Sequence, residues 1–173
     1  MTPPDLTVMP PELDQRAERV RRLLGALYRE EARAAAYRAF RRRATEEPLR
    51  KMLDTYLQVE ARFIGILERH LAELGVGRPG RVGPLRRVLR GLGAVLGAAI
   101  AWRGNAAILR RAKVEEWSGA QRYGKEIDWP GWSPLERWSL DGHRCDQLYQ
   151  SHWAGEVARD RAAAQGGDSR AGT

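Results

Sequence analysis

The sequence predicts an all-α protein, a helical bundle with one additional apolar helical segment. Apolar residues recur at spacings of three and four over long stretches, a pattern typical of amphipathic helices, and they do not alternate as in a strand. Short connections rich in proline and glycine separate these stretches, as they do between the helices of a bundle. With 173 residues, 43% of them hydrophobic, the chain can form one domain with an apolar core.

The two ends of the chain are expected to be flexible. Residues 1–10 lack the basic start and apolar centre of a signal peptide, so they are interpreted as an arm. Residues 165–173 are small and polar and are interpreted as a tail, which leaves residues 11–164 for the helical domain. The single cysteine, Cys145, excludes an internal disulfide and favours a reducing cytoplasm, and we expect its side chain to be buried and inert.

Boundary residues predict the first two helices. The first begins near Pro11, where proline and two early acidic residues suit a helix N-terminus, and it runs to about Arg43. Thr45 is expected to cap the second helix, which starts with the acidic pair before Pro48. That helix ends at the glycines of "GVGRPGRVGP".

The third segment, residues 84–103, has an apolar centre between basic ends. The uncharged run from Gly91 to Trp102 is too short to cross a bilayer core, which needs about 20 residues. The segment therefore either lies in a membrane interface or packs against partner helices as a small-residue core helix. The residues expected to contact lipid are Arg86, Arg87, Arg90, Leu92, Leu96, Trp102 and Arg103.

The net charge of +8 is concentrated around this segment. Nine basic residues and no acidic ones lie between Leu74 and Val114, so the rest of the chain is nearly neutral. We expect this region to meet an anionic membrane surface. A nucleic acid is not expected, because the arginines are interleaved with glycine and aliphatic residues and no recognition motif is present.

The fourth helix is predicted over residues 105–127 and the fifth over residues 134–164. The fifth helix has two candidate inward faces, and the pattern leaves its orientation open. One face carries Leu140, His143, Gln147, Gln150, Ala154 and Val157, and the other carries Trp138, Cys145, Tyr149 and His152.

Three glutamates interrupt the apolar stripes of three different helices. They are Glu30, Glu60 and Glu116, each with an aromatic or aliphatic residue one turn away. A buried carboxylate must be protonated, paired or bound to metal. Di-metal bundles gather one Glu from each of two helices and Glu-x-x-His from two others, and such oxygen and imidazole ligands suit non-haem iron. We therefore expect the three side chains to converge at one interior point.

Four stretches occur in an order and at spacings similar to those of a known family. They are "YREEARAAAY", "LQVEARF", "RPGRVGPLRRVLRGLGAVLGAAIAWRG" and "AKVEEWSGAQRYGKEI", within roughly residues 20–157. Through them the chain resembles the demethoxyubiquinone hydroxylases, the ferritin-like, membrane-associated di-iron monooxygenases of ubiquinone biosynthesis. The resemblance implies a ferritin-like four-helix bundle on the inner face of the cell membrane, with iron as cofactor and a lipophilic, quinone-like substrate.

The ligand pattern of that family is incomplete in this chain. In "EARF", Phe63 stands where the family has histidine, and in "RCDQLYQ", Gln147 and Gln150 stand where it has glutamate and histidine. A phenyl group is no ligand, and an amide is a weak ligand for iron. His143, one turn before Gln147, is a further candidate ligand beside the three glutamates.

Three states of the interior therefore stay open. They are an eroded di-iron site, a single metal on the three glutamates and His143, and a metal-free bundle. In the metal-free bundle the glutamates would be protonated, paired with arginines such as Arg62 or Arg144, or turned toward the edge of the helix surface. The first two predict a metal-dependent monooxygenase acting on a quinone-like substrate. The third predicts a non-catalytic protein that binds anionic membrane, quinone or lipid. A second copy of the chain is another candidate partner.

Overall fold

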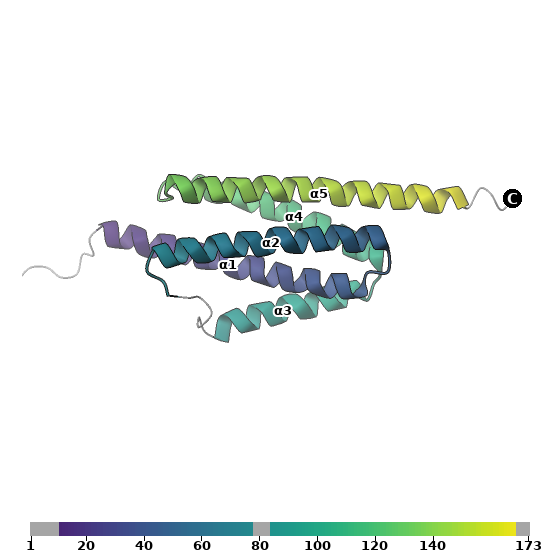
Figure 1. The fold of residues 1–173 in the computed structure, drawn as a ribbon, viewed down its shortest axis with the longest axis horizontal. Coiled ribbons are helices and arrows are strands. Elements are labelled where there is room, and N and C mark those ends of the chain that lie inside the picture. Colours follow the sequence, from purple (N-terminus) through teal and green to yellow (C-terminus); the bar gives the residue numbers. More distant parts are fainter. Residues whose placement is uncertain (1–10, 78–83, 169–173) are drawn as a thin grey trace, which may run out of the picture.

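The computed structural model describes residues 11–77 and 84–168, and within them the chain forms five helices and no strand (Figure 1). The helices are α1 (Pro11–Arg43), α2 (Glu47–Glu73), α3 (Pro84–Ala101), α4 (Asn105–Ile127) and α5 (Pro134–Asp168). The predicted all-α class is confirmed. Residues 165–168 of the expected tail continue α5, whereas the expected arm, residues 1–10, and residues 169–173 lie outside the described residues.

The end of α2 follows the glycine signal of the sequence. Gly75 has a φ of 74°, in the left-handed region that favours glycine. The amide of Gly75 donates to the carbonyl of Ala72 at 2.9 Å, and the amide of Val76 donates to the carbonyl of Leu71 at 2.9 Å. These two bonds form a Schellman motif, which satisfies carbonyls that the helix end leaves free.

The prediction that Thr45 caps α2 is wrong. The N-cap residue is Glu46, and its side chain makes no capping bond. Thr45 instead pairs with Asn105: the Asn105 amide nitrogen Nδ2 donates to Thr45 Oγ1 at 2.8 Å, and the Thr45 backbone amide donates to Asn105 Oδ1 at 3.2 Å. This pair ties the first residue of α4 to the connection between α1 and α2.

Four helices surround the interior, and α3 lies outside them. Consecutive helices run in opposite directions, with α1 against both α2 and α3, and with α4 against α5 (Figure 1). α2 also contacts α5, which closes the interior on the side away from α3. The first candidate face of α5 is the buried one, whereas Trp138 and Tyr149 of the second face are exposed. The expectation of a buried Cys145 is wrong, because it lies on this exposed face.

The interior consists of two apolar clusters separated by a polar layer. One cluster is built from Tyr37, Phe40, Leu49, Met52, Leu53, Tyr56, Ile108, Leu109 and neighbouring alanines. The other is built from Leu23, Leu27, Phe63, Leu67, Leu71, Tyr123, Trp132 and Leu140. Each of α1, α2, α4 and α5 carries buried polar residues between the two clusters. The polar layer therefore crosses all four helices near mid-length.

Glycines allow α3 to pack closely on α1. A Cβ atom added to Gly93 would lie 2.2 Å from the carbonyl oxygen of Ala32, and one added to Gly97 would lie 2.7 Å from Ala36 Cα. The backbones of the two helices thus approach closer than larger residues would permit.

The other face of α3 is exposed and apolar. It carries Leu92, Val95 and Leu96, whose exposed fractions are 52%, 67% and 58%. Arg87 and Arg90 lie beside these side chains and are also exposed. In the part of the chain that the structure describes, no helix combines the length and the hydropathy that crossing a membrane requires.

Candidate functional site

The polar layer brings together the three glutamates that the sequence singled out. Glu30 on α1, Glu60 on α2 and Glu116 on α4 are each 0% exposed. α5 contributes the buried side chains of His143, Gln147 and Gln150. Residues distant in the sequence are therefore adjacent in the interior, because each lies at the point where its helix passes between the two apolar clusters.

The cation of this layer is Arg33. Its Nη1 atom lies 2.9 Å from Glu30 Oε2, 3.3 Å from Glu60 Oε1 and 3.8 Å from Glu116 Oε2. The Arg33 side chain is only 5% exposed, so the contacts are shielded from water. A single guanidinium thus touches carboxylates from three helices.

Arg62 and Arg144, the partners considered from the sequence, do not reach the layer. Arg62 pairs with Asp146, and Arg144 pairs with Asp141, both near the surface. Arg33 follows Glu30 by three residues, a spacing that places both on one face of a helix. That spacing was the available signal for the true partner.

Two tyrosines cross-link the glutamates of α1 and α4. Tyr123 Oη donates to Glu30 Oε1 at 2.5 Å, and Tyr37 Oη donates to Glu116 Oε1. On each helix the tyrosine follows the glutamate by seven residues, or about 10 Å at 1.5 Å per residue. Because α1 and α4 are antiparallel, equal spacing lets each glutamate accept a bond from the tyrosine of the other helix.

Burial and charge separate the protonation states of the three carboxyl groups. Burial raises the pKa of Glu30, but the Arg33 guanidinium and the hydrogen bonds to the carboxylate together lower it by more, so this pKa lies below its ordinary value. Burial and the negative charge of Glu30 raise the pKa of Glu60 well above its ordinary value. Burial raises the pKa of Glu116 to about 7, although Arg33 opposes the rise. At neutral pH the layer therefore holds one firmly ionised carboxylate, Glu30, beside one guanidinium.

His143 is held between Phe63 and the polar layer. Its ring stacks on Phe63, with ring centroids 3.7 Å apart. The Gln147 amide nitrogen Nε2 donates to His143 Nε2 at 2.9 Å, and the same ring nitrogen lies 3.6 Å from Glu30 Oε2. Burial lowers the pKa of His143, so its imidazole is neutral at pH 7.

One metal ion could be held by part of this layer. Glu30, Glu60 and His143 each offer a ligand atom, and these atoms lie within 4.8 Å of one another. The donor set is carboxylate and imidazole, which suits a transition metal. However, Arg33 already contacts both of these carboxylates, so an ion and the guanidinium would compete for the same oxygens.

A second metal does not fit the residues present. Phe63 offers no donor atom, and Gln147 and Gln150 offer only neutral amides. Gln147 Oε1 and both polar side-chain atoms of Gln150 are buried without a hydrogen-bond partner among the described residues. The geometry is therefore that of an ion-paired polar layer, in which one metal ion would have to displace Arg33 from Glu30 and Glu60.

A hollow of about 290 Å³ between α2 and α5 reaches this layer. Phe63 and His143 line its inner part, and Arg62, Trp138 and Asp146 line its outer part.

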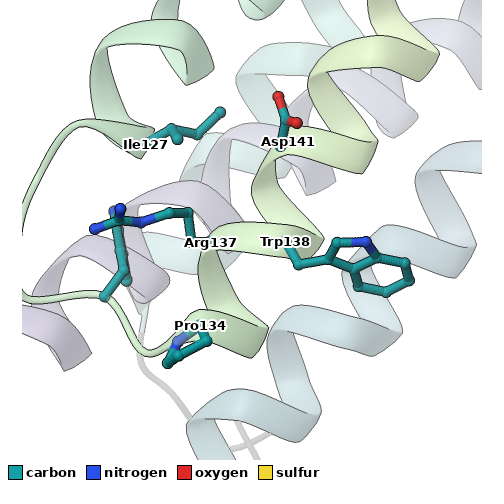
Figure 2. Close-up of a pocket in the computed structure, with 6 residues that line it drawn as sticks. Ile127, Pro134, Arg137, Trp138 and Asp141 are labelled. Carbon is teal, nitrogen blue, oxygen red and sulfur yellow. The ribbon is translucent and has the colours of Figure 1, made fainter.

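A larger hollow, about 570 Å³, lies at the turn between α4 and α5, where Figure 2 shows Ile127, Pro134 and Arg137 around it. Trp138 belongs to the walls of both hollows, but no residue of the polar layer lines the larger one. The smaller hollow, which His143 lines, gives a ligand access to the buried site.

Comparisons with family models, with curated proteins and with solved structures found no match for this chain.

Proposed function

We propose that this protein is a non-catalytic, membrane-peripheral member of the demethoxyubiquinone hydroxylase type, with a ferritin-like four-helix scaffold in which Arg33 replaces metal ions. The supporting observation is the position of Arg33 Nη1 beside carboxylates from three helices, at 2.9, 3.3 and 3.8 Å. Buried carboxylates need a compensating positive charge, and a guanidinium supplies it without a metal. The replacement of family ligands by Phe63, Gln147 and Gln150 favours the same conclusion.

Attachment to the inner face of the cell membrane would use the exposed face of α3. Leu92, Val95 and Leu96 would enter the boundary between headgroups and acyl chains, while Arg87 and Arg90 would meet anionic headgroups. Each arginine near such a surface contributes about 1 kcal/mol. Arg86 would not contribute, because its guanidinium bonds to Glu31 and to Glu68 at the junction with α1 and α2.

Trp102 and Arg103 extend this surface at the end of α3. Trp102 is 72% exposed, and the guanidinium of Arg43 lies 4.1 Å from the centroid of its ring. An exposed indole beside cations suits the headgroup region of a membrane. A lipophilic, quinone-like ring or a lipid chain would bind in the smaller hollow beside Phe63, which opens between α2 and α5 on the side away from α3. Its 290 Å³ is at the small end of ligand sites.

Metal analysis tests the non-catalytic part of this proposal. We expect protein purified from iron-supplemented cells to carry much less than half an equivalent of transition metal per chain, and we expect Glu60→Ala to leave that content unchanged. A full equivalent that Glu60→Ala abolishes would contradict the proposal.

That contrary result would instead support a second candidate function, a single-metal monooxygenase acting on a quinone-like substrate. The observation that favours it is the proximity of the ligand atoms of Glu30, Glu60 and His143, all within 4.8 Å. Iron would then be bound by these three side chains, and Arg33 would have to leave its present position beside the two carboxylates.

Vesicle flotation tests the membrane part. Wild-type protein should float with vesicles that contain an anionic lipid and not with pure phosphatidylcholine, and Leu92→Gln with Leu96→Gln should weaken flotation. The matched control is Val114→Gln with Leu135→Gln, whose side chains are 55% and 56% exposed on other helices. An equal loss of flotation in the two double variants would contradict a role for α3 in membrane binding. A dimer that only the α3 variant dissociates would identify this face as a self-association surface.

A further inference from the structure

Four arginines line one groove between α1 and α3, which we call the arginine groove. Its walls carry Arg38 and Arg42 from α1 and Arg87 and Arg90 from α3, and its volume is about 460 Å³. Arg38 and Arg42 are one helical turn apart, so both guanidinium groups can reach the same side of α1. Two of the four were not among the residues that the sequence marked for lipid contact.

These four charges lack acidic partners among the described residues. Other arginines of the same two helices are paired: Arg41 with Asp54 at 2.8 Å, and Arg86 with Glu31. No such ion pair involves the four groove arginines among the side chains that the structure describes, those of residues 14–77 and 86–164. Like charges that share a groove repel one another, and a bound anion would relieve this repulsion.

The floor of the groove is made of small residues. Ala35, Gly91 and Ala94 lie between the arginines, and a Cβ atom added to Gly91 would meet nothing within 4 Å. A compact anion can therefore approach the helix backbones while guanidinium groups surround it. Guanidinium forks bind phosphate oxygens in bidentate geometry, so a phosphate group is the anion that this arrangement fits best.

The groove borders the exposed apolar face of α3. Arg87 and Arg90 belong to the groove, whereas Val88 and Leu92, next to them on the same helix, are 54% and 52% exposed. If that face lies at the acyl boundary, the arginines are placed at the depth of the headgroups. The neighbouring apolar surface thus points to a lipid as the source of the phosphate.

We propose that the arginine groove binds the phosphate of an anionic phospholipid headgroup and orients the protein on the membrane. This inference rests on the membrane attachment proposed above and adds a defined headgroup site to it. Non-specific electrostatic attraction to the membrane depends only on the charge of the protein surface. A specific phosphate site depends also on whether the cation is a guanidinium or an ammonium group.

Charge-conserving substitutions separate these two cases. The full chain is mixed with phosphatidylcholine vesicles doped either with phosphatidic acid or with cholesteryl hemisuccinate, an anion without phosphate, at matched zeta potential. We expect tighter binding to the phosphatidic acid vesicles. Arg38→Lys with Arg42→Lys should weaken that binding about fivefold or more, because lysine lacks the bidentate fork, and should leave binding to the hemisuccinate vesicles unchanged. The matched control is Arg69→Lys with Arg122→Lys, at exposed positions outside the groove, which should change neither.

The outcomes distinguish the groove from the membrane attachment itself. Binding to both vesicle types with no effect of Arg38→Lys and Arg42→Lys would overturn the groove and leave attachment intact. No binding to either vesicle type would overturn the membrane attachment and the assignment of the groove to a lipid headgroup. Inorganic pyrophosphate, added to the protein without vesicles, is the third probe. If it raises the melting temperature of wild type but not of the variant with Arg38→Lys and Arg42→Lys, and vesicles do not bind, the groove binds free phosphate and the lipid assignment is wrong.

Discussion

Replacement of Arg33 by methionine should destabilise the protein strongly at neutral pH. The substitution keeps an unbranched side chain but removes the cation that lies 2.9 Å from Glu30 Oε2 inside the polar layer. Breaking a buried ion pair by removing one partner typically costs about 3–5 kcal/mol, because the other charge stays buried and unpaired. The Arg33 side chain is 5% exposed, so water cannot take its place without rearrangement.

The pH dependence of this loss follows from Glu30. Without Arg33 the folded protein can avoid a buried charge by protonating Glu30, whose ordinary pKa is 4.5. Holding that proton at pH 7 costs about 3.4 kcal/mol, at 1.36 kcal/mol per pH unit above the ordinary pKa, whereas at pH 5 it costs only about 0.7 kcal/mol. The variant's deficit should therefore be about 2–3 kcal/mol smaller at pH 5 than at pH 7.

Urea denaturation of metal-free protein at both pH values measures this deficit. Arg62→Met is the control, since Arg62 pairs with Asp146 at the surface and its loss should cost no more than about 1 kcal/mol. Adding Glu30→Gln to Arg33→Met should recover part of the stability at pH 7, because the unpaired charge is then absent. A deficit below about 1 kcal/mol at pH 7, or one independent of pH, would refute the assignment of Arg33 as the interior cation.

Three further predictions concern titration, packing and exposure. Because the pKa of Glu116 is raised from 4.5 to about 7, the folded state keeps a proton that the unfolded chain has lost, so the unfolding free energy should decrease as pH rises through this interval. Glu116→Gln should remove this pH dependence when the unfolding free energy is measured by urea denaturation at several pH values. An unchanged slope of unfolding free energy against pH would contradict the prediction. Gly93→Ala should cost about 1–3 kcal/mol, because the new Cβ meets the Ala32 carbonyl, whereas Gly65→Ala, with open space around it, should not destabilise. Native Cys145 should react with a thiol reagent nearly as fast as in urea, since it is exposed, and strong protection would contradict its position.

Local signals were sufficient to predict the helices. Pro11, Gly75, Asn105 and Pro134 each lie at or beside a boundary that the sequence marked. The positions of the glutamates were predictable too, because a carboxylate within a helical apolar stripe must face the interior when the stripe is buried. The orientation of α5 was not predictable from its own sequence, since both faces carry apolar and polar residues, and packing against α2 and α4 decides between them.

The pairing inside the polar layer depends on information that a single helix does not carry. An arginine at the edge of an apolar stripe usually extends to solvent along its alkyl stem. Arg33 turns inward because carboxylates from α2 and α4 meet there, and this meeting exists only in the folded state. The reciprocal bonds of Tyr37 and Tyr123 were closer to predictable, because equal seven-residue spacings on two antiparallel helices allow both bonds to form together.

If one cation is what the polar layer requires, a metal ion should be able to replace Arg33 once that side chain is removed. In Arg33→Met, Glu30, Glu60 and His143 keep ligand atoms within 4.8 Å of one another, and no guanidinium competes for them. A divalent ion at a hundredfold excess over its dissociation constant would add about 2.7 kcal/mol. For a chain of this size that corresponds to a rise in melting temperature of roughly 5–10 °C.

Manganese titration followed by thermal unfolding tests this exchange of cations. The melting temperature of Arg33→Met should rise with manganese, and Arg33→Met with Glu60→Ala should lose the response because one ligand is missing. Wild-type protein should respond much less, because the ion must displace a guanidinium that lies 2.9 Å from one carboxylate and 3.3 Å from another. If wild type and Arg33→Met responded equally, the ion would bind elsewhere or beside the guanidinium, and the replacement of metal by Arg33 would be the wrong account of this interior.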